Sequence, residues 1–151
     1  MRISAKADYA VRAALELAAA TELPVKGERI AEAQRIPPKF LENILVDLRQ
    51  AGLVASQRGP DGGYRLDLPA DQITVADVIR AVDGPLAVVH GDRPDATRYE
   101  GAAEALQEVW VALRANVRAV LEQVSLADMV EGSLPASVRA LAAEPDAWTR
   151  H

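Results

Sequence analysis

The chain has 151 residues, of which 50% are hydrophobic and 26% are charged, the composition of a folded globular domain rather than of a disordered segment. It contains no cysteine, which excludes disulfides, a thiol nucleophile and any zinc or iron–sulfur site held by its own thiolates. No apolar run approaches the roughly 20 residues of a membrane span, and the charged N-terminus lacks the pattern of a signal peptide. We therefore expect a soluble, cytoplasmic protein.

The charge is unevenly divided along the chain. Residues 1–66 contain ten basic and eight acidic side chains, a net charge of +2. Residues 67–151 contain seven basic and fourteen acidic side chains, a net charge of −7, so that the whole chain carries −5. An N-terminal part that tolerates a polyanion is thus followed by an acidic C-terminal part, which raises the question of a nucleic-acid partner.

Three helices are expected in the first third of the chain. Ser4 can cap a helix that runs to about residue 20, and residues 27–34 form a second, shorter helix. A tight connection follows, and Pro38 suits the first position of a third helix over residues 38–51 because its missing N–H would be unpaired there anyway. Two short helices joined by such a turn form a helix-turn-helix.

The third helix has two distinct faces. Its apolar side is predicted to be buried and consists of Phe40, Leu41, Ile44, Leu45 and Leu48. The opposite side, at the same spacing of three and four residues, carries Lys39, Glu42, Asn43 and Val46.

A β-hairpin is expected directly after this helix. Residues 53–57 and 64–68 flank the sequence Arg58-Gly59-Pro60-Asp61-Gly62-Gly63, whose composition is typical of a turn. A hairpin in this place is the pattern of a winged helix-turn-helix. Thr74 and Asp77 then form a near capping box at the start of a further helix, which Gly84 ends.

The C-terminal half is predicted to contain a long loop and a long helix. Residues 85–100 are irregular and polar. The helix from about Gly101 to Val124 carries a heptad seam of Leu106, Trp110, Leu113, Val117, Val120 and Val124. A short helix over residues 125–131 follows, and residues 132–151 are a tail for which the sequence indicates no definite structure.

No arrangement of side chains favours an enzyme. His90 and His151 are the only histidines, and neither has a partner at a spacing typical of metal ligands. The glycines between residues 59 and 63 lack the strand–loop–helix context of a phosphate loop. Asp92 and Asp95 are interpreted as solvated loop residues, and no nucleophile has a base within the reach of a known motif.

A DNA-binding interpretation fits the residues better. Lys39 can contact a phosphate or guanine, Glu42 can accept a hydrogen bond from cytosine N4, and Asn43 can bind adenine. Arg58 in the hairpin turn can enter a minor groove, where the negative potential attracts arginine. The alternative for each side chain is a solvated surface group, and the order of the elements is what favours the DNA-binding reading.

These residues resemble the Rrf2 family of bacterial winged-helix regulators. The resemblance rests on Ile36-Pro37-Pro38-Lys39-Phe40-Leu41-Glu42-Asn43-Ile44-Leu45, on Arg58-Gly59, and on Gly62-Gly63-Tyr64-Arg65-Leu66. The opening Met1-Arg2-Ile3-Ser4 with Tyr9, the stretch over residues 74–84 and the stretch over residues 125–130 extend it to about residue 131.

The resemblance implies a homodimeric transcription factor, usually a repressor, that binds a partly palindromic operator. It implies that Lys39, Glu42 and Asn43 contact the major groove and that Arg58 and Gly59 hold the wing against the minor groove. It also implies that Arg2, Ser4 and Tyr9 lie near the phosphates.

The absence of cysteine departs from many members of the family, which hold an iron–sulfur cluster with three cysteines near the start of the long helix. Asp8 lies where some nitric-oxide-sensing members place a carboxylate ligand, but a carboxylate alone cannot hold a cluster, and we interpret Asp8 as an acid at a helix N-terminus. The chain is more similar to members without a cluster, some of which govern sulfur metabolism with cysteine synthase as a partner.

The sequence therefore predicts a mainly α fold with a small β-hairpin wing. We expect a winged helix-turn-helix domain over residues 1–84, a loop over 85–100, a dimerisation helix with a short following helix over 101–131, and a tail over 132–151. The predicted partners are double-stranded DNA and a second copy of the chain, with no metal and no cofactor. Two alternatives remain open: a winged helix that binds a partner protein, such as a sulfur-metabolism enzyme, or a small effector bound near His90, Tyr99 and Trp110.

Overall fold

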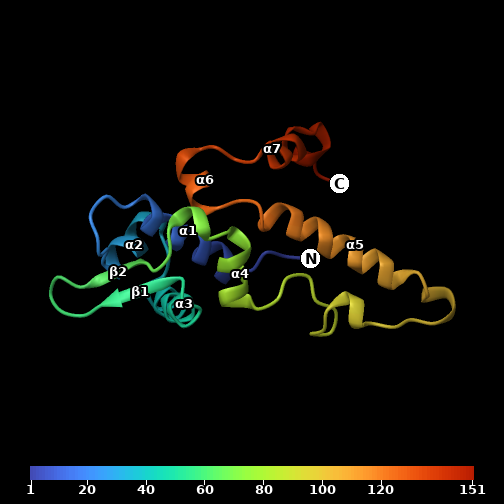
Figure 1. Ribbon diagram of the computed structural model, residues 1–151, viewed down its shortest axis with the longest axis horizontal. Coiled ribbons are helices and arrows are strands. Elements are labelled where there is room, and N and C mark those ends of the chain that lie inside the picture. Colours follow the sequence, from blue (N-terminus) through green and yellow to red (C-terminus); the bar gives the residue numbers. More distant parts are fainter.

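The computed structural model describes residues 1–151 and is mainly helical, with one two-stranded antiparallel hairpin, as the sequence predicts. Helices α1–α4 and the hairpin gather at one end of the molecule, and α5 extends away from them as an arm (Figure 1). The elements are α1 (Ala5–Ala19), α2 (Gly27–Gln34), α3 (Pro38–Gln50), β1 (Val54–Gln57), β2 (Gly63–Leu66), α4 (Val75–Asp83), α5 (Leu106–Leu121), α6 (Leu126–Glu131) and α7 (Ala136–Ala143).

Helix α1 is the centre of the winged-helix unit and packs against α2, α3, α4 and α6. Apart from Leu17, its buried face consists of alanine side chains, so the neighbouring helices can approach closely. Larger side chains from α2, α3, α4 and the segment before α4 complete the core, and Ile30, Ile44, Leu48, Ile73 and Val78 are all fully buried. The buried residues of α1 are Ala7, Ala10, Ala13, Ala14 and Leu17.

The turn between α2 and α3 is tight and ends in the core. Arg35 adopts the left-handed conformation that commonly ends a helix. The N–H of Ile36 donates to the carbonyl of Ala31 at 2.9 Å, and the Ile36 side chain is buried. Pro38 then begins α3, as predicted.

The apolar face of α3 is buried as predicted at Leu41, Ile44, Leu45 and Leu48. The prediction for Phe40 is wrong, because this side chain is 43% exposed. Helical periodicity places residue 40 at the margin of the buried face, where its ring packs in a T-shaped arrangement with the Tyr9 ring at a centroid distance of 5.6 Å. Phe40 therefore covers the rim of the core rather than filling it.

The hairpin forms the wing, and the chain preceding α2 supports it. Val54 pairs with Leu66 and Ser56 pairs with Tyr64 across the two strands. Tyr64 also exchanges two backbone hydrogen bonds of 2.8 Å with Val25, which extends the pairing to the segment between α1 and α2. The wing is thus fixed to the helix-turn-helix rather than joined to it by the chain alone.

Helix α5 is shorter than the predicted helix over residues 101–124. A single tight turn over Gly101–Ala103 precedes it, and the helix itself spans Leu106–Leu121. Beyond its end, the carbonyl of Val124 accepts a hydrogen bond from the N–H of Val75 at 2.9 Å. Val124 is buried within its own chain and does not continue the seam along α5.

After α5 the chain returns to the winged-helix core. Ser125 forms a capping box with Asp128 at the start of α6, and Leu126 is fully buried with side chains of α1 and α3. The core therefore includes a residue from beyond the long helix, although the sequence predicted this residue to be part of the dimerisation segment over 101–131.

The tail over residues 132–151 has definite structure, which the sequence did not indicate. It contains α7 and a final tight turn over Pro145–Trp148. Neither piece has a buried residue. None of the helices is both long and apolar enough to cross a membrane.

Candidate DNA-binding surface

The exposed face of α3 carries the three side chains that the sequence predicts to contact bases. Lys39, Glu42 and Asn43 are all exposed on the first two turns of the helix. Pro38 at the start of α3 fixes these residues at the end that approaches DNA in helix-turn-helix proteins. The nearest ion pair of the helix lies one turn further on, where Lys6 of α1 binds Asp47 at 2.6 Å.

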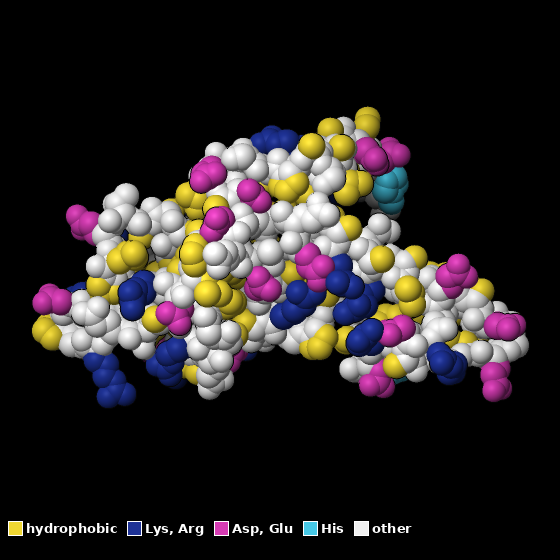
Figure 2. Space-filling view, viewed as in Figure 1, with side chains coloured by type: hydrophobic (Ala, Val, Ile, Leu, Met, Phe, Trp, Pro, Cys, Tyr) yellow, Lys and Arg dark blue, Asp and Glu magenta, His cyan; other side chains and the backbone are white.

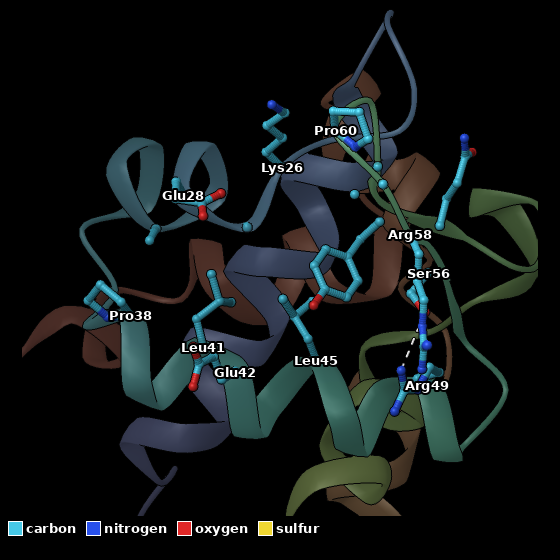
Figure 3. A pocket seen from close by; sticks show the side chains of 17 residues that line it. Lys26, Glu28, Pro38, Leu41, Glu42, Leu45, Arg49, Ser56, Arg58 and Pro60 are labelled. Carbon is cyan, nitrogen blue, oxygen red and sulfur yellow. Dashed lines mark hydrogen bonds between the residues drawn. The ribbon is translucent and has the colours of Figure 1, made fainter.

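A groove separates α3 from the wing. It is lined by the start of α2, one side of α3 and the hairpin turn, and its hollow measures about 590 Å³. Figure 3 shows Pro38 and Glu42 toward one end of α3, Arg49 toward the other, and Arg58 on the wing beyond Arg49. The groove therefore brings Glu42 and Arg58 to the two sides of one surface.

The wing turn places Arg58 and Gly59 in solvent. The turn closes through the N–H of Gly62, which donates to the carbonyl of Gly59 at 3.0 Å. Gly62 and Gly63 are required by close approach: a Cβ at Gly62 would lie 2.2 Å from the Gln57 carbonyl oxygen, and one at Gly63 would lie 2.4 Å from that of Val25. Both glycines thus hold the turn that presents Arg58.

The three N-terminal residues of the predicted surface occupy different environments. Arg2 is exposed, whereas the Ser4 hydroxyl donates to Asp83 at 2.5 Å and accepts from the N–H of Ala7 at 2.9 Å. Ser4 is therefore the cap of α1 and has no hydrogen left to donate to a phosphate. The Tyr9 ring is half-buried between Phe40 and Arg12, whose guanidinium carbon lies 4.7 Å from the ring centre.

Asp8 is an acid in the first turn of α1, as predicted. Its carboxylate pairs with Arg12 at 3.0 Å on the same helix. The Asp8 side chain is thus engaged in an ion pair with a residue one turn further along α1.

A family model described as "Rrf2: Iron-dependent Transcriptional regulator" matches residues 3–132 of this chain. The chain belongs to the Rrf2 family. A putative HTH-type transcriptional regulator of Mycobacterium tuberculosis is 51% identical to it over 158 residues, covering 100% of this chain and 96% of that protein. The HTH-type transcriptional regulator CymR of Bacillus subtilis is 35% identical over 130 residues, covering 85% of this chain and 89% of CymR.

Solved structures of Rrf2-type regulators have the same fold. The structure of CymR, the global cysteine regulator of B. subtilis, matches with a TM-score of 0.74 and 33% identity over 87% of this chain and 98% of that one. The structure of IscR from T. potens matches with a TM-score of 0.71 and 30% identity over 99% of this chain and 97% of that one. These relatives are named transcriptional regulators, and this chain shares their winged-helix architecture.

The description of the family names iron, but the residues of this Rrf2 chain do not fit an iron–sulfur cluster. The chain has no cysteine, and nowhere do three His, Cys, Asp or Glu side chains gather in a way that could hold a metal ion. His90 is exposed in the loop after α4.

Hydrogen bonds within the chain hold the loop before α5. The Gln107 side-chain amide lies within hydrogen-bonding distance of the carbonyls of Pro94, Asp95 and Thr97, at 3.5, 3.1 and 2.5 Å. Arg93 binds the Asp95 carboxylate, and this hydrogen bond holds the pKa of Asp95 below its ordinary value. Gln107 is thus the centre of the hydrogen bonds that hold this loop, a role that the sequence did not indicate.

The predicted seam on α5 is divided by the fold. Val117 and Leu121 pack against the small core cluster of Ala7, Ala76, Ile79 and Leu86 within the same chain. Leu106, Trp110, Leu113 and Val120 are each only half-buried and belong to neither core cluster, and Val109 beside them is 54% exposed. The last turns of α5 are thus anchored to the winged helix, while the seam residues nearer its start pack against neither core cluster and stay partly exposed.

The far end of the arm is acidic. Figure 2 shows acidic side chains gathered at the end of the molecule that the loop and the start of α5 occupy. Glu100, Glu104 and Glu108 are exposed in this region. A polyanion would be repelled from this end, which favours the winged helix as the surface that meets DNA.

Proposed function

We propose that this Rrf2 protein is a sequence-specific DNA-binding regulator that acts as a homodimer on a partly palindromic operator and represses transcription. The observation that carries the proposal is the pairing of two exposed features. Lys39, Glu42 and Asn43 form a polar stripe on α3, and Arg58 lies across the adjoining groove on the wing. Neither feature is needed to build the core, so both are free to contact a ligand.

In this proposal the first two turns of α3 lie in the major groove. Asn43 can form two hydrogen bonds with adenine, and Glu42 can accept one from the amino group of cytosine. Lys39, at the start of the helix, contacts a guanine or a phosphate. Through these contacts α3 determines which bases the protein recognises.

The wing and the start of α1 complete the contact. Arg58 enters an adjacent minor groove, where narrow A·T-rich sequence concentrates negative potential, and Gly59 lets the backbone approach closely. Arg2 and Tyr9 lie near the phosphates. Ser4 contributes indirectly, because its cap fixes the start of α1, which carries Tyr9 and follows Arg2.

The partly exposed seam residues near the start of α5, which lie outside both core clusters, support a two-fold dimer. In a symmetric pair the same stripe serves both subunits, and the two winged helices then face half-sites related by the same axis. Such half-sites lie about one helical turn of DNA apart, or 34–36 Å. Repression follows where such an operator overlaps a promoter.

The proposal is tested by incubating the purified protein with fragmented genomic DNA at moderate salt and sequencing the bound fragments. We expect enrichment of one or a few palindromic sites, and transcription in vitro from an adjoining promoter should fall when the protein is added. Retention of fragments with no common sequence would contradict sequence-specific binding. Retention of none, together with binding of a partner protein that does not depend on salt, would favour the protein-interaction alternative.

A further inference from the structure

One cationic side chain lies where α3 meets the wing, and the predicted DNA contacts leave it unused. Arg49 is exposed in the last turn of α3 and lines the groove, and its guanidinium donates to the Ser56 hydroxyl of β1 at 3.3 Å. Figure 3 shows this hydrogen bond joining the helix to the base of the wing, below Arg58. The bond holds the long Arg49 side chain along the groove.

Arg49 continues the exposed stripe of α3. Residues 39, 42, 46 and 49 recur at spacings of three and four, so Arg49 lies on the same side of the helix as Lys39 and Glu42. Ten residues of α-helix separate Lys39 from Arg49, a rise of about 15 Å. Arg49 is thus too far along α3 to share a base pair with Lys39 and lies at the edge of the region that enters the major groove.

No carboxylate of the chain neutralises Arg49. The ion pairs of the protein join Lys6 to Asp47, Arg12 to Asp8, Arg93 to Asp95, and both Arg80 and Arg118 to Glu122. The only hydrogen-bond partner of the Arg49 guanidinium is the neutral Ser56 hydroxyl. Its charge is therefore available to an anion.

The arrangement of DNA grooves identifies that anion. A protein that places one element in a major groove and another in the adjacent minor groove spans the phosphate strand that separates them. Arg49 and Ser56 lie at the junction of α3 and the wing, the two elements that the proposed function assigns to those grooves. Resting on that function, we propose that Arg49, positioned by Ser56, binds a phosphate of the DNA strand that runs between the two grooves.

Both side chains have the right chemistry for a phosphate. The guanidinium keeps further N–H donors after its hydrogen bond to Ser56. The Ser56 hydroxyl accepts that bond and can donate its own hydrogen to a second phosphate oxygen. The contact carries no sequence information and fixes how deeply α3 and the wing enter their grooves.

The hairpin register provides a matched control. Ser56 pairs with Tyr64, and the next pair, Ala55 with Arg65, lies on the opposite face of the hairpin because side chains alternate along a strand. Arg65 is exposed. It is therefore an arginine of the same wing that faces away from α3 and from the proposed phosphate.

The test measures the dissociation constant for the enriched operator and for a random duplex between 50 and 200 mM KCl. For Arg49→Gln we expect weaker binding to both duplexes and a salt slope smaller in magnitude by about 0.9, the contribution of one phosphate contact. Between those salt concentrations the variant should lose affinity about three- to four-fold less than the wild type does. Arg65→Gln should keep the wild-type slope, and Arg49→Lys should restore most of it.

The alternative role for Arg49 is to stabilise the C-terminal end of α3, where a cation is favourable. That role would lower the melting temperature of Arg49→Gln and leave the salt slope unchanged, which would overturn the proposal. Loss of affinity for the operator alone would also overturn it, because it would assign Arg49 to a base. If the wild-type protein binds neither duplex, the proposed function fails as well, and the two failures are thereby distinguished.

Discussion

Glu42 is the residue of α3 whose substitution best separates recognition from affinity. In the proposed DNA complex its carboxylate accepts a hydrogen bond from cytosine but is repelled by phosphates, so we expect it to contribute to selection rather than to overall attraction. We expect Glu42→Ala to reduce discrimination at one base pair of each half-site by about 1–3 kcal/mol. Binding to random DNA should become no weaker.

The measurement is a comparison of affinities for operators that carry each of the four base pairs at the affected position. Glu32→Ala is the control. Glu32 is exposed on α2, so this substitution removes the same charge at a position away from the exposed face of α3. If Glu42→Ala keeps the wild-type preference at every position, Glu42 does not contact a base.

Gly63 lies in β2 of the wing, where the neighbouring backbone leaves no room for a side chain. An alanine Cβ would lie 2.4 Å from the carbonyl oxygen of Val25, which itself accepts the hydrogen bond that fixes Tyr64. We expect Gly63→Ala to lower the free energy of unfolding by about 1–3 kcal/mol, the usual cost of forcing extra volume into a packed site. Because Arg58 moves with the wing, binding to A·T-rich flanks should weaken as well.

Urea denaturation measures the loss of stability of Gly63→Ala, and binding to operators with A·T-rich flanks measures the loss of affinity. Gly27→Ala is the matched control, since a Cβ there would meet Tyr64 at 3.6 Å, an ordinary contact. It should change stability by less than about 0.5 kcal/mol. Equal stability of the Gly63→Ala and Gly27→Ala variants would show that the wing can shift without cost.

At the scale of whole elements, the carboxylate of Glu122 fixes the end of α5 against α4. It binds Arg118 at 2.9 Å on α5 and Arg80 on α4, and these hydrogen bonds lower the pKa of Glu122 from 4.5 to about 2. A carboxyl group with a lowered pKa in the folded state stabilises the fold above its unfolded pKa and loses that effect as the pH falls through the folded value. The stabilisation should therefore be complete above pH 4.5 and disappear toward pH 2.

We expect the wild type to lose more free energy of unfolding between pH 4.5 and 2 than Glu122→Gln does, and the two curves to converge at the acid end. Urea unfolding over this range measures the difference. Glu108→Gln, an exposed glutamate of the same helix that forms no ion pair, should follow the wild type. Parallel curves for Glu122→Gln and the wild type would show that the ion pairs do not hold α5.

The elements that the sequence predicted well are those with strong local signals. Ser4, Pro38, Thr74 and Gly84 mark the ends of helices through their own hydrogen bonds or backbone preferences, and the structure uses them as predicted. Heptad periodicity could not show where α5 ends. The hydrogen bond between Val124 and Val75 joins segments far apart in the chain, and no local pattern reports it.

In the candidate site, too, the residues that lie on one helix could be predicted from the sequence, whereas contacts between elements could not. Lys39, Glu42 and Asn43 follow from the spacing of polar residues on one helix, and all three are exposed. The hydrogen bond between Arg49 and Ser56 depends on how the wing folds back on α3, which spacing alone does not determine. Likewise, the hydrogen bond from Ser4 to Asp83 depends on how α1 packs against α4, and the sequence alone does not predict it.

At the scale of the whole molecule, the proposed homodimer depends on the part of the α5 seam that lies outside both core clusters. Val117 and Leu121, in the last turns of α5, pack against the core of their own chain, so the seam residues left for a partner are those nearer its start, Leu106, Trp110 and Leu113, with Val109 beside them. A buried charge without a counterion is strongly unfavourable. We therefore expect Leu113→Asp to convert dimers into monomers without unfolding the winged helix.

Sedimentation equilibrium gives the oligomeric state, and circular dichroism checks that the helices remain. Val111→Asp is the control: Val111 is 41% exposed on the same helix but off the seam, so the same added charge should leave the dimer intact. The monomeric variant should bind a single half-site as the wild-type winged helix does, yet lose the gain in affinity that two linked half-sites provide. If Leu113→Asp sediments as the wild type does, the subunits do not associate through this side of α5.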